Sequence, residues 1–204
     1  MFQPLTKPVT FEEFLECQPE SGRYELHNGV IIELQPTGTH ERIAAFLAAE
    51  LTGEFRRLKL PYFIPNKGLV KIPSKQSGYF PDVLILDDRA LADEPLWSKS
   101  STVQRGVSIP LVIEVISTNW RDDYFYKLGD YEELGMTEYW IVDYLGLGGK
   151  RFIGNPKQPT ISIYQLSDDE YQVSQYRGAE QIVSPTFPEL NLTAEQIFER
   201  RASA

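Results

Sequence analysis

The spacing of apolar residues predicts four helices. They span residues 9–17, 40–59, 120–134 and 194–200. In the second, apolar residues recur at intervals of three and four, which is typical of an amphipathic helix of about five turns. Thr10 and Thr39 are the expected N-cap residues of the first two helices, and Gly135 ends the third.

Extended segments separate these helices. Strands are predicted over 62–64, 68–72, 79–86, 111–116, 138–144, 161–166 and 171–177, and a hairpin over 24–34. Asn28-Gly29 between two β-rich runs is a strong hairpin signal. The nearly continuous apolar runs over 79–86 and 111–116 predict strands in the middle of a sheet that is covered on both faces. Residues 87–108 are charged, Ser-rich and without a period, so we expect a long surface loop.

The order of these elements predicts one α/β domain over residues 1–204. We place its core at about 36–145, an N-terminal helix and hairpin at 9–35, and C-terminal strands with a helix at 150–200. The sequence contains neither an internal repeat nor a linker long enough to divide two domains.

Composition narrows the class of protein. The longest apolar run, Ile43–Ala49, has seven residues, whereas a membrane span needs about 18–20. The single cysteine, Cys17, excludes an internal disulfide, and the N-terminus has no basic region followed by an apolar one, so we expect a cytoplasmic protein. With 20 Lys and Arg against 29 Asp and Glu, the formal charge is −9. This balance argues against a protein that coats nucleic acid non-specifically.

Two carboxylates interrupt apolar strands and are the first candidates for chemistry. Asp82 precedes the apolar run 83–86, and Glu114 lies inside the run 111–116. A carboxylate in a central strand costs several kcal/mol unless it is paired or binds a metal. Either residue could instead face solvent at a sheet edge or pair with an arginine.

The helix that follows adds three polar residues with helical spacing. Asp123, Lys127 and Tyr131 stand at i, i+4 and i+8 and therefore share one helical face. A solvated ion pair on the surface of the helix is the alternative interpretation. His40 opens a helix after a turn, where a core or capping histidine is commoner than a catalytic one, and Glu25 is a weaker candidate for which a solvated side chain is the alternative.

Several common sites are absent from the sequence. It contains no G-x-G-x-x-G motif, no Walker loop and no G-x-S-x-G motif. Cys17, His27 and His40 are too few for a zinc site of the Cys/His type.

Several motifs, in the right order, resemble the restriction-endonuclease-like family of putative bacterial PD-(D/E)XK nucleases. They are Phe80–Val83, Pro110–Ser117, Asp123–Leu128, Tyr131 and Gly135–Asp143, with Arg23–Gly29 and Pro36–His40 upstream. The resemblance covers about residues 10–165. It implies a core of a helix, a three-stranded antiparallel meander, a crossover helix and a further strand.

The resemblance also implies an activity and roles for residues. A DNA endonuclease of this kind would hold Mg²⁺, or Mn²⁺, through Asp82, Glu114 and the carbonyl of Val115. The catalytic lysine normally stands two residues after the second acid, where this chain has Ile116. Lys127 is the candidate replacement. The alternative is a nuclease-fold protein that binds a protein or nucleic acid without cleaving; a different metal hydrolase has no positive signal.

A basic stretch near these residues predicts contacts to DNA. Between residues 53 and 75 six basic residues face one acid, Glu54, a local balance of 6 − 1 = +5. The six are Arg56, Arg57, Lys59, Lys67, Lys71 and Lys75. A solvated helix end and loop would show the same pattern. We also expect a homodimer, because cutting both strands needs two sites.

Overall fold

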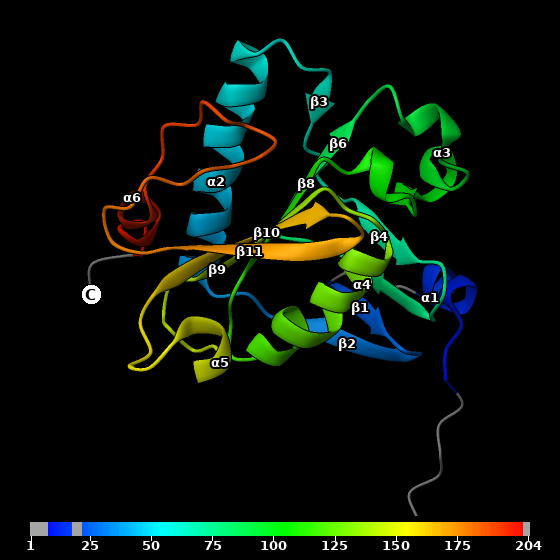
Figure 1. Cartoon of the computed structure of the whole chain (residues 1–204). Helices are drawn as coiled ribbons and strands as arrows, with labels where there is room; N and C mark the ends of the chain where they lie inside the picture. Colours follow the sequence, from blue (N-terminus) through cyan, green and yellow to red (C-terminus); the bar gives the residue numbers. More distant parts are fainter. Residues whose placement is uncertain (1–7, 18–21, 202–204) are drawn as a thin grey trace, which may run out of the picture.

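The computed structural model describes residues 8–17 and 22–201, which form two β-sheets and several helices (Figure 1). The helices are α1 (Phe11–Cys17), α2 (Gly38–Arg57), α3 (Trp97–Ser100), the π-helix η3 (Asp122–Lys127), α4 (Leu128–Glu133), α5 (Lys150–Ile153) and α6 (Ala194–Phe198), with 3-10 turns η1 (Leu91–Asp93) and η2 (Gly106–Ser108). The strands are β1 (Arg23–His27), β2 (Val30–Leu34), β3 (Tyr62–Phe63), β4 (Leu69–Ile72), β5 (Ser77–Tyr79), β6 (Val83–Asp87), β7 (Thr102–Val103), β8 (Leu111–Val115), β9 (Glu138–Asp143), β10 (Thr160–Ser167) and β11 (Glu170–Tyr176).

The main sheet has the order β11-β10-β9-β8-β6-β3, and its only parallel pair among the described strands is β8 with β9. Strands β3, β6 and β8 are antiparallel neighbours, and the η3–α4 helix crosses over to β9. This is the core order that the sequence predicts. Strands β4 and β5 instead join the hairpin and β7 in a second sheet, of order β2-β1-β5-β4-β7.

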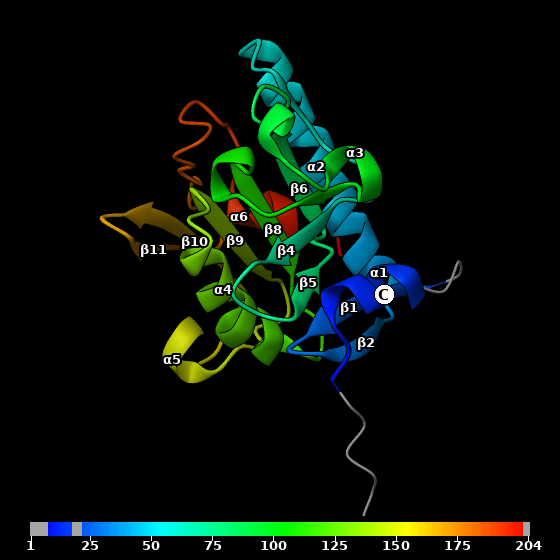
Figure 2. The same cartoon turned by 90° about the vertical axis from the view of Figure 1, so that its right-hand side faces the viewer.

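Each face of the main sheet is covered, as the apolar runs predict. On one face, side chains of α2 and α6 such as Leu47 and Ile197 pack against Ile85, Ile113 and Trp140. On the other face lie the second sheet and the η3–α4 helix, which Figure 2 shows in front of the main sheet. No helix among the described residues is long and apolar enough to cross a membrane.

The predicted strand 79–86 is divided in two at Pro81 and Asp82. Its first part, β5, belongs to the second sheet, and its second part, β6, belongs to the main sheet. Proline lacks the N–H that a sheet ladder needs, so the chain changes sheets there. In the β6–β8 register Val83 pairs with Ile113, and one further step places Asp82 opposite Glu114.

The predicted helices exist, with corrections at their ends. The N-cap of α1 is confirmed: the Glu13 N–H donates to Thr10 Oγ1 at 3.1 Å, and the Thr10 N–H donates to Glu13 Oε2 at 2.8 Å. The N-cap of α2 is Thr37 rather than Thr39, since Thr37 has an extended backbone and its hydroxyl accepts from the His40 N–H at 3.3 Å.

The prediction of a long loop over 87–108 is wrong. This segment contains η1, α3, β7 and η2, and β7 pairs in parallel with β4. The buried Glu94 carboxylate accepts the backbone N–H groups of Gln104 at 3.0 Å and Arg105 at 3.1 Å. These elements are too short to leave a period in the sequence.

Candidate functional site

The candidate residues gather where β6, β8, β1, the start of α2 and η3 meet. A cavity of about 420 Å³ opens at this point. Six of the predicted residues line it together with Val115: Glu25, His40, Asp82, Glu114, Asp123 and Lys127. The seventh, Tyr131, reaches the cluster from α4 through Glu114. The structure therefore brings the predicted acids and the lysine together from β1, the turn before β6, β8 and η3, and adds His40 from the start of α2.

Asp82 is held in place from three sides. Its Oδ2 accepts from the Val115 N–H at 2.8 Å and lies 3.0 Å from His40 Nε2, and its Oδ1 lies 3.4 Å from an Arg23 nitrogen. Burial opposes ionisation, but the His40 hydrogen bond and the nearby positive charges hold the pKa of Asp82 below its ordinary value.

Lys127 lies at the centre of the cluster. Its Nζ is 3.0 Å from Glu114 Oε1, 3.2 Å from Glu25 Oε1 and 3.4 Å from Asp123 Oδ1. The residue is only 4% exposed. Burial alone would lower the pKa of Lys127, but the surrounding carboxylates raise it well above its ordinary value. The lysine is thus an ammonium held between three acids.

Asp123 and Lys127 stand four residues apart in η3, and both line the cavity. Burial raises the pKa of Asp123 to about 7, although the Lys127 charge opposes this. Burial also raises the pKa of Glu114 well above its ordinary value, with Lys127 opposing and Asp82 adding to the rise. The Glu114 carboxylate accepts from the Tyr131 hydroxyl at 3.0 Å.

Glu25 connects the hairpin to the site. Its Oε1 accepts from the Phe80 N–H at 2.9 Å, and its Oε2 lies 2.9 Å from His27 Nε2. Burial raises the pKa of Glu25, but the Lys127 charge and the His27 hydrogen bond more than offset this and lower it overall. The alternative expectation of a solvated Glu25 is therefore wrong, since the residue is buried.

His40 is buried beside Asp82. Burial disfavours its charged form, but the Asp82 hydrogen bond and charge outweigh this and raise the pKa of His40. Its Nδ1 is buried and makes no hydrogen bond to the described residues. His40 therefore contacts a candidate metal ligand rather than filling the core.

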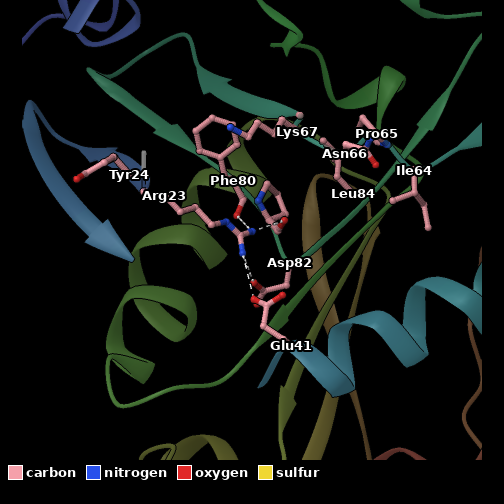
Figure 3. Close-up of a pocket in the computed structure, with 13 residues that line it drawn as sticks. Arg23, Tyr24, Glu41, Ile64, Pro65, Asn66, Lys67, Phe80, Asp82 and Leu84 are labelled. Carbon is pink, nitrogen blue, oxygen red and sulfur yellow. Dashed lines mark hydrogen bonds and ion pairs between the residues drawn. The ribbon is translucent and has the colours of Figure 1, made fainter. Parts of the chain in front are cut away.

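Arg23 is the site residue that the sequence analysis missed, although it stands in a quoted motif. Its guanidinium donates to the carbonyls of Phe80 at 2.8 Å and Pro81 at 3.0 Å and reaches Asp82 (Figure 3). It also lines a second hollow of about 360 Å³, together with Asp82 and Lys67. The side chain of Asp82 thus borders two hollows.

The six basic residues predicted to contact DNA do not gather at the cavity. Arg57 pairs with Glu54 at 2.7 Å, Lys71 pairs with Glu12 at 3.3 Å, and Lys75 pairs with Asp130. Arg56 and Lys59 lie exposed around the C-terminal end of α2. Among the six, Lys67 alone lines a hollow that reaches Asp82.

The oxygen atoms of the site suit a hard divalent cation. Two carboxylates and one backbone carbonyl are the ligand types that Mg²⁺ and Mn²⁺ prefer. Over the described residues, both hydrogen bonds to the Glu114 carboxylate go to Oε1, which leaves Oε2 available. No group of three or more His, Cys, Asp or Glu side chains in residues 8–17 and 22–201 is arranged to hold a metal. A cation here would need the Val115 carbonyl as a ligand.

The comparisons with known proteins address the fold and the family. The model of a family described as Uma2, putative restriction endonuclease, matches residues 11–195. The chain is similar to the crystal structure of a putative nuclease belonging to DUF820 from Anabaena variabilis ATCC 29413, with a TM-score of 0.73 and 15% identity over 96% of this chain and 100% of that chain. At this identity the likeness concerns the fold, and it confirms the predicted α/β class. No curated protein matches the chain.

Proposed function

Because this chain belongs to the Uma2 family of putative restriction endonucleases, we propose that it hydrolyses phosphodiester bonds of DNA with the help of Mg²⁺. The observation that carries the proposal is the convergence of Asp82, Glu114 and Lys127 on one cavity. The family supports a nuclease in general, while the substrate and the metal are our inference.

We propose that Asp82, Glu114 and the Val115 carbonyl hold the metal ion. Bound Mg²⁺ would polarise the phosphate and lower the pKa of a water molecule. Arg23, His40 and the Val115 N–H fix the Asp82 carboxylate, so that little reorganisation is needed on binding.

Lys127 has a positioning and electrostatic role in this proposal. Its ammonium lies 3.0 Å from Glu114 Oε1, next to the proposed metal ligands. Negative charge that develops on the phosphate would be stabilised there in a water-poor environment. Glu25 and Asp123 hold the ammonium in place, at 3.2 Å and 3.4 Å.

Cleavage assays with matched variants test the proposal. Purified protein is incubated with supercoiled plasmid and with single-stranded DNA, in Mg²⁺, in Mn²⁺ and in EDTA. We expect metal-dependent cleavage that falls at least about 100-fold in Asp82→Asn and Glu114→Gln. Asp88→Asn, which alters an exposed carboxylate outside both hollows, serves as the control. Equal cleavage by Asp82→Asn and the parent would refute the proposal.

A binding protein without cleavage is the second candidate. It is favoured by Ile116, which is fully buried at the usual position of the lysine, and by the pairing of Lys127 with Glu114. Isothermal titration calorimetry distinguishes the two candidates. If the parent binds Mg²⁺ and Glu114→Gln abolishes this, the alternative of a binding protein without cleavage is contradicted. If the parent neither binds Mg²⁺ nor cleaves DNA, that alternative is supported. The expected homodimer stays a prediction, which sedimentation equilibrium tests.

A further inference from the structure

The segment between β9 and β10 is basic although the chain as a whole is acidic. Residues 144–159 contain Lys150, Arg151 and Lys157 and no carboxylate, whereas the chain carries a formal charge of −9. All three side chains are exposed. Helix α5 begins in this segment and lies beside the helical turn that precedes α4 (Figure 1).

Aromatic rings lie between these cations. The Phe125 and Phe152 rings meet edge to face at 5.1 Å, and Trp120 lies 6.1 Å from Phe125. The Arg151 guanidinium covers Phe125 at 4.0 Å and Phe152 at 4.5 Å. We define the aromatic–basic patch as Trp120, Arg121, Phe125, Arg151, Phe152 and Lys157, in which Arg121 and Lys157 face Trp120 at 4.7 Å and 6.0 Å.

The aromatic–basic patch adjoins the mouth of the cavity. Asn119, which precedes Trp120, and Leu147 both line the cavity. The Lys157 ammonium donates to the Leu147 carbonyl at 2.9 Å. A polymer bound on the patch would therefore reach Asp82 and Glu114 without crossing the molecule.

We propose that the aromatic–basic patch binds a single-stranded stretch of the nucleic-acid substrate and leads it into the cavity. This inference rests on the proposed nuclease function. Exposed cations complement phosphates, and aromatic faces stack on unpaired bases, whose own faces are hidden in a duplex. Phe125 is 42% exposed, so ring surface is available at the patch.

The patch satisfies these requirements better than the basic stretch 53–75. In that stretch Arg57, Lys71 and Lys75 are taken up by ion pairs with carboxylates. Neither Arg56 nor Lys59 lines the cavity. The charges of the patch instead lie over rings, and no carboxylate among the described residues forms a salt bridge with Arg121, Arg151 or Lys157.

Fluorescence anisotropy without divalent metal tests the proposal. The probe is a fluorescein-labelled single strand longer than a binding site of about 4–16 nucleotides. The duplex of the same sequence is measured for comparison. We expect Arg151→Ala with Lys157→Ala to weaken single-strand binding about tenfold. The slope of log K against log salt concentration should become less steep by about 1.4, because two phosphate contacts are lost at about 0.7 each. Phe125→Ala should weaken single-strand binding and leave duplex binding unchanged.

Two further double variants are the controls. Lys99→Ala with Arg105→Ala removes one exposed lysine and one exposed arginine from another surface, and binding should stay within about twofold of the parent. Arg56→Ala with Lys59→Ala tests the competing stretch. The proposal is overturned if this second pair weakens binding and the patch pair does not, if the duplex binds more tightly than the single strand, or if the parent binds neither.

The outcomes separate this inference from the proposed function. If the parent cleaves DNA and the patch variant binds as tightly as the parent, the proposed role of the patch is refuted and the proposed nuclease function stands. If binding depends on the patch but the parent cleaves nothing in Mg²⁺ or Mn²⁺, the role of the patch is supported and the proposed nuclease function is refuted. Melting curves of all variants confirm that each is folded.

Discussion

At the scale of single residues, the Lys127 ammonium balances three carboxylates that lose contact with water on folding. Glu25, Glu114 and Asp123 all lie within 3.4 Å of its Nζ. Removing one partner from a buried ion cluster leaves charges uncompensated, which costs about 3–5 kcal/mol. The stability of the site should therefore depend on this one side chain.

Lys127→Met should destabilise the protein by about 3–5 kcal/mol at pH 8 and by less at pH 5. Burial already raises the pKa values of Glu114 and Asp123 above their ordinary values, and loss of the opposing Lys127 charge should raise them further. In the variant, these carboxyl groups stabilise the folded state fully only below their pKa in the unfolded chain. This stabilisation is lost as the pH rises through their pKa in the folded protein. Urea denaturation at both pH values measures the difference. A loss that is equal at the two pH values would show that the acids do not depend on Lys127.

A second buried acid, Glu138, depends on hydrogen-bond donors rather than on a cation. Its carboxylate accepts from Trp140 Nε1 at 2.5 Å, from Ser184 Oγ at 3.0 Å and from the Thr186 N–H at 2.7 Å. All three partners donate, so an amide group at this position would direct its NH₂ toward a donor.

Glu138→Gln should therefore destabilise the protein by about 1–3 kcal/mol. Urea denaturation followed by tryptophan fluorescence measures the change. The control is Glu50→Gln, an exposed residue on α2 for which we expect no change. A Glu138→Gln variant as stable as the parent would show that the donors are not essential.

The sequence identifies site residues when they break a pattern. Asp82 and Glu114 interrupt apolar strands, and Lys127 follows Asp123 at helical spacing. Arg23 breaks no pattern. Its role arises because β1 pairs with β5 and so places the hairpin beside Pro81, and a long-range contact of this kind leaves no local signal.

At the scale of elements, η2 packs tightly against the end of α4. A Cβ atom on Gly106 would overlap the backbone of Leu134 and Gly135. Gly135 itself has a φ of +76°, a conformation that ends the helix and that side chains disfavour. The segment 87–108 is thus fixed at this point by a backbone contact.

Gly106→Ala should destabilise the protein by about 1–3 kcal/mol, because the backbone cannot move aside cheaply. It should also make 87–108 easier to cleave in limited proteolysis. Gly129→Ala is the matched control, since nothing lies within 4 Å of its added Cβ. There we expect unchanged or slightly higher stability, by up to about 1 kcal/mol. Equal melting temperatures for the two variants would contradict the tight contact.

Long elements with a clear period could be predicted, whereas the shortest elements within 87–108 and 144–159 could not. Helix α2 and strands β8 to β11 were expected close to their observed bounds. The four-residue helices α3 and α5 and the two-residue strand β7 depend on neighbours such as β4. The division of β5 from β6 likewise needs the second sheet, although Pro81 marks the point.

At the scale of the whole molecule, the C-terminal part belongs to the same core as the site. Strand β10 pairs with β9 in the main sheet, and Phe187, Leu192 and Ile197 are buried in the α2 side of the core. The sequence predicts the C-terminal segments as additions to a core at 36–145, whereas in the structure these residues close one face of the central sheet.

We therefore predict one cooperative unfolding transition for the whole chain. In differential scanning calorimetry the calorimetric and van't Hoff enthalpies should agree. A truncation after residue 159 removes β10, β11 and α6 and should not fold, because it exposes the apolar face under α6. Two separated transitions, or a folded truncated chain, would contradict the prediction of a single domain.

The hairpin that carries Arg23 and Glu25 has a practical consequence for protein engineering. It joins the rest of the chain through the exposed Gln35 and Pro36, before Thr37 caps α2. A chain cut between these two residues yields a small piece with two of the site's charged groups and a large piece with the others. Fused to two interacting proteins, the pieces would form a split protein whose candidate site is assembled only when those proteins meet.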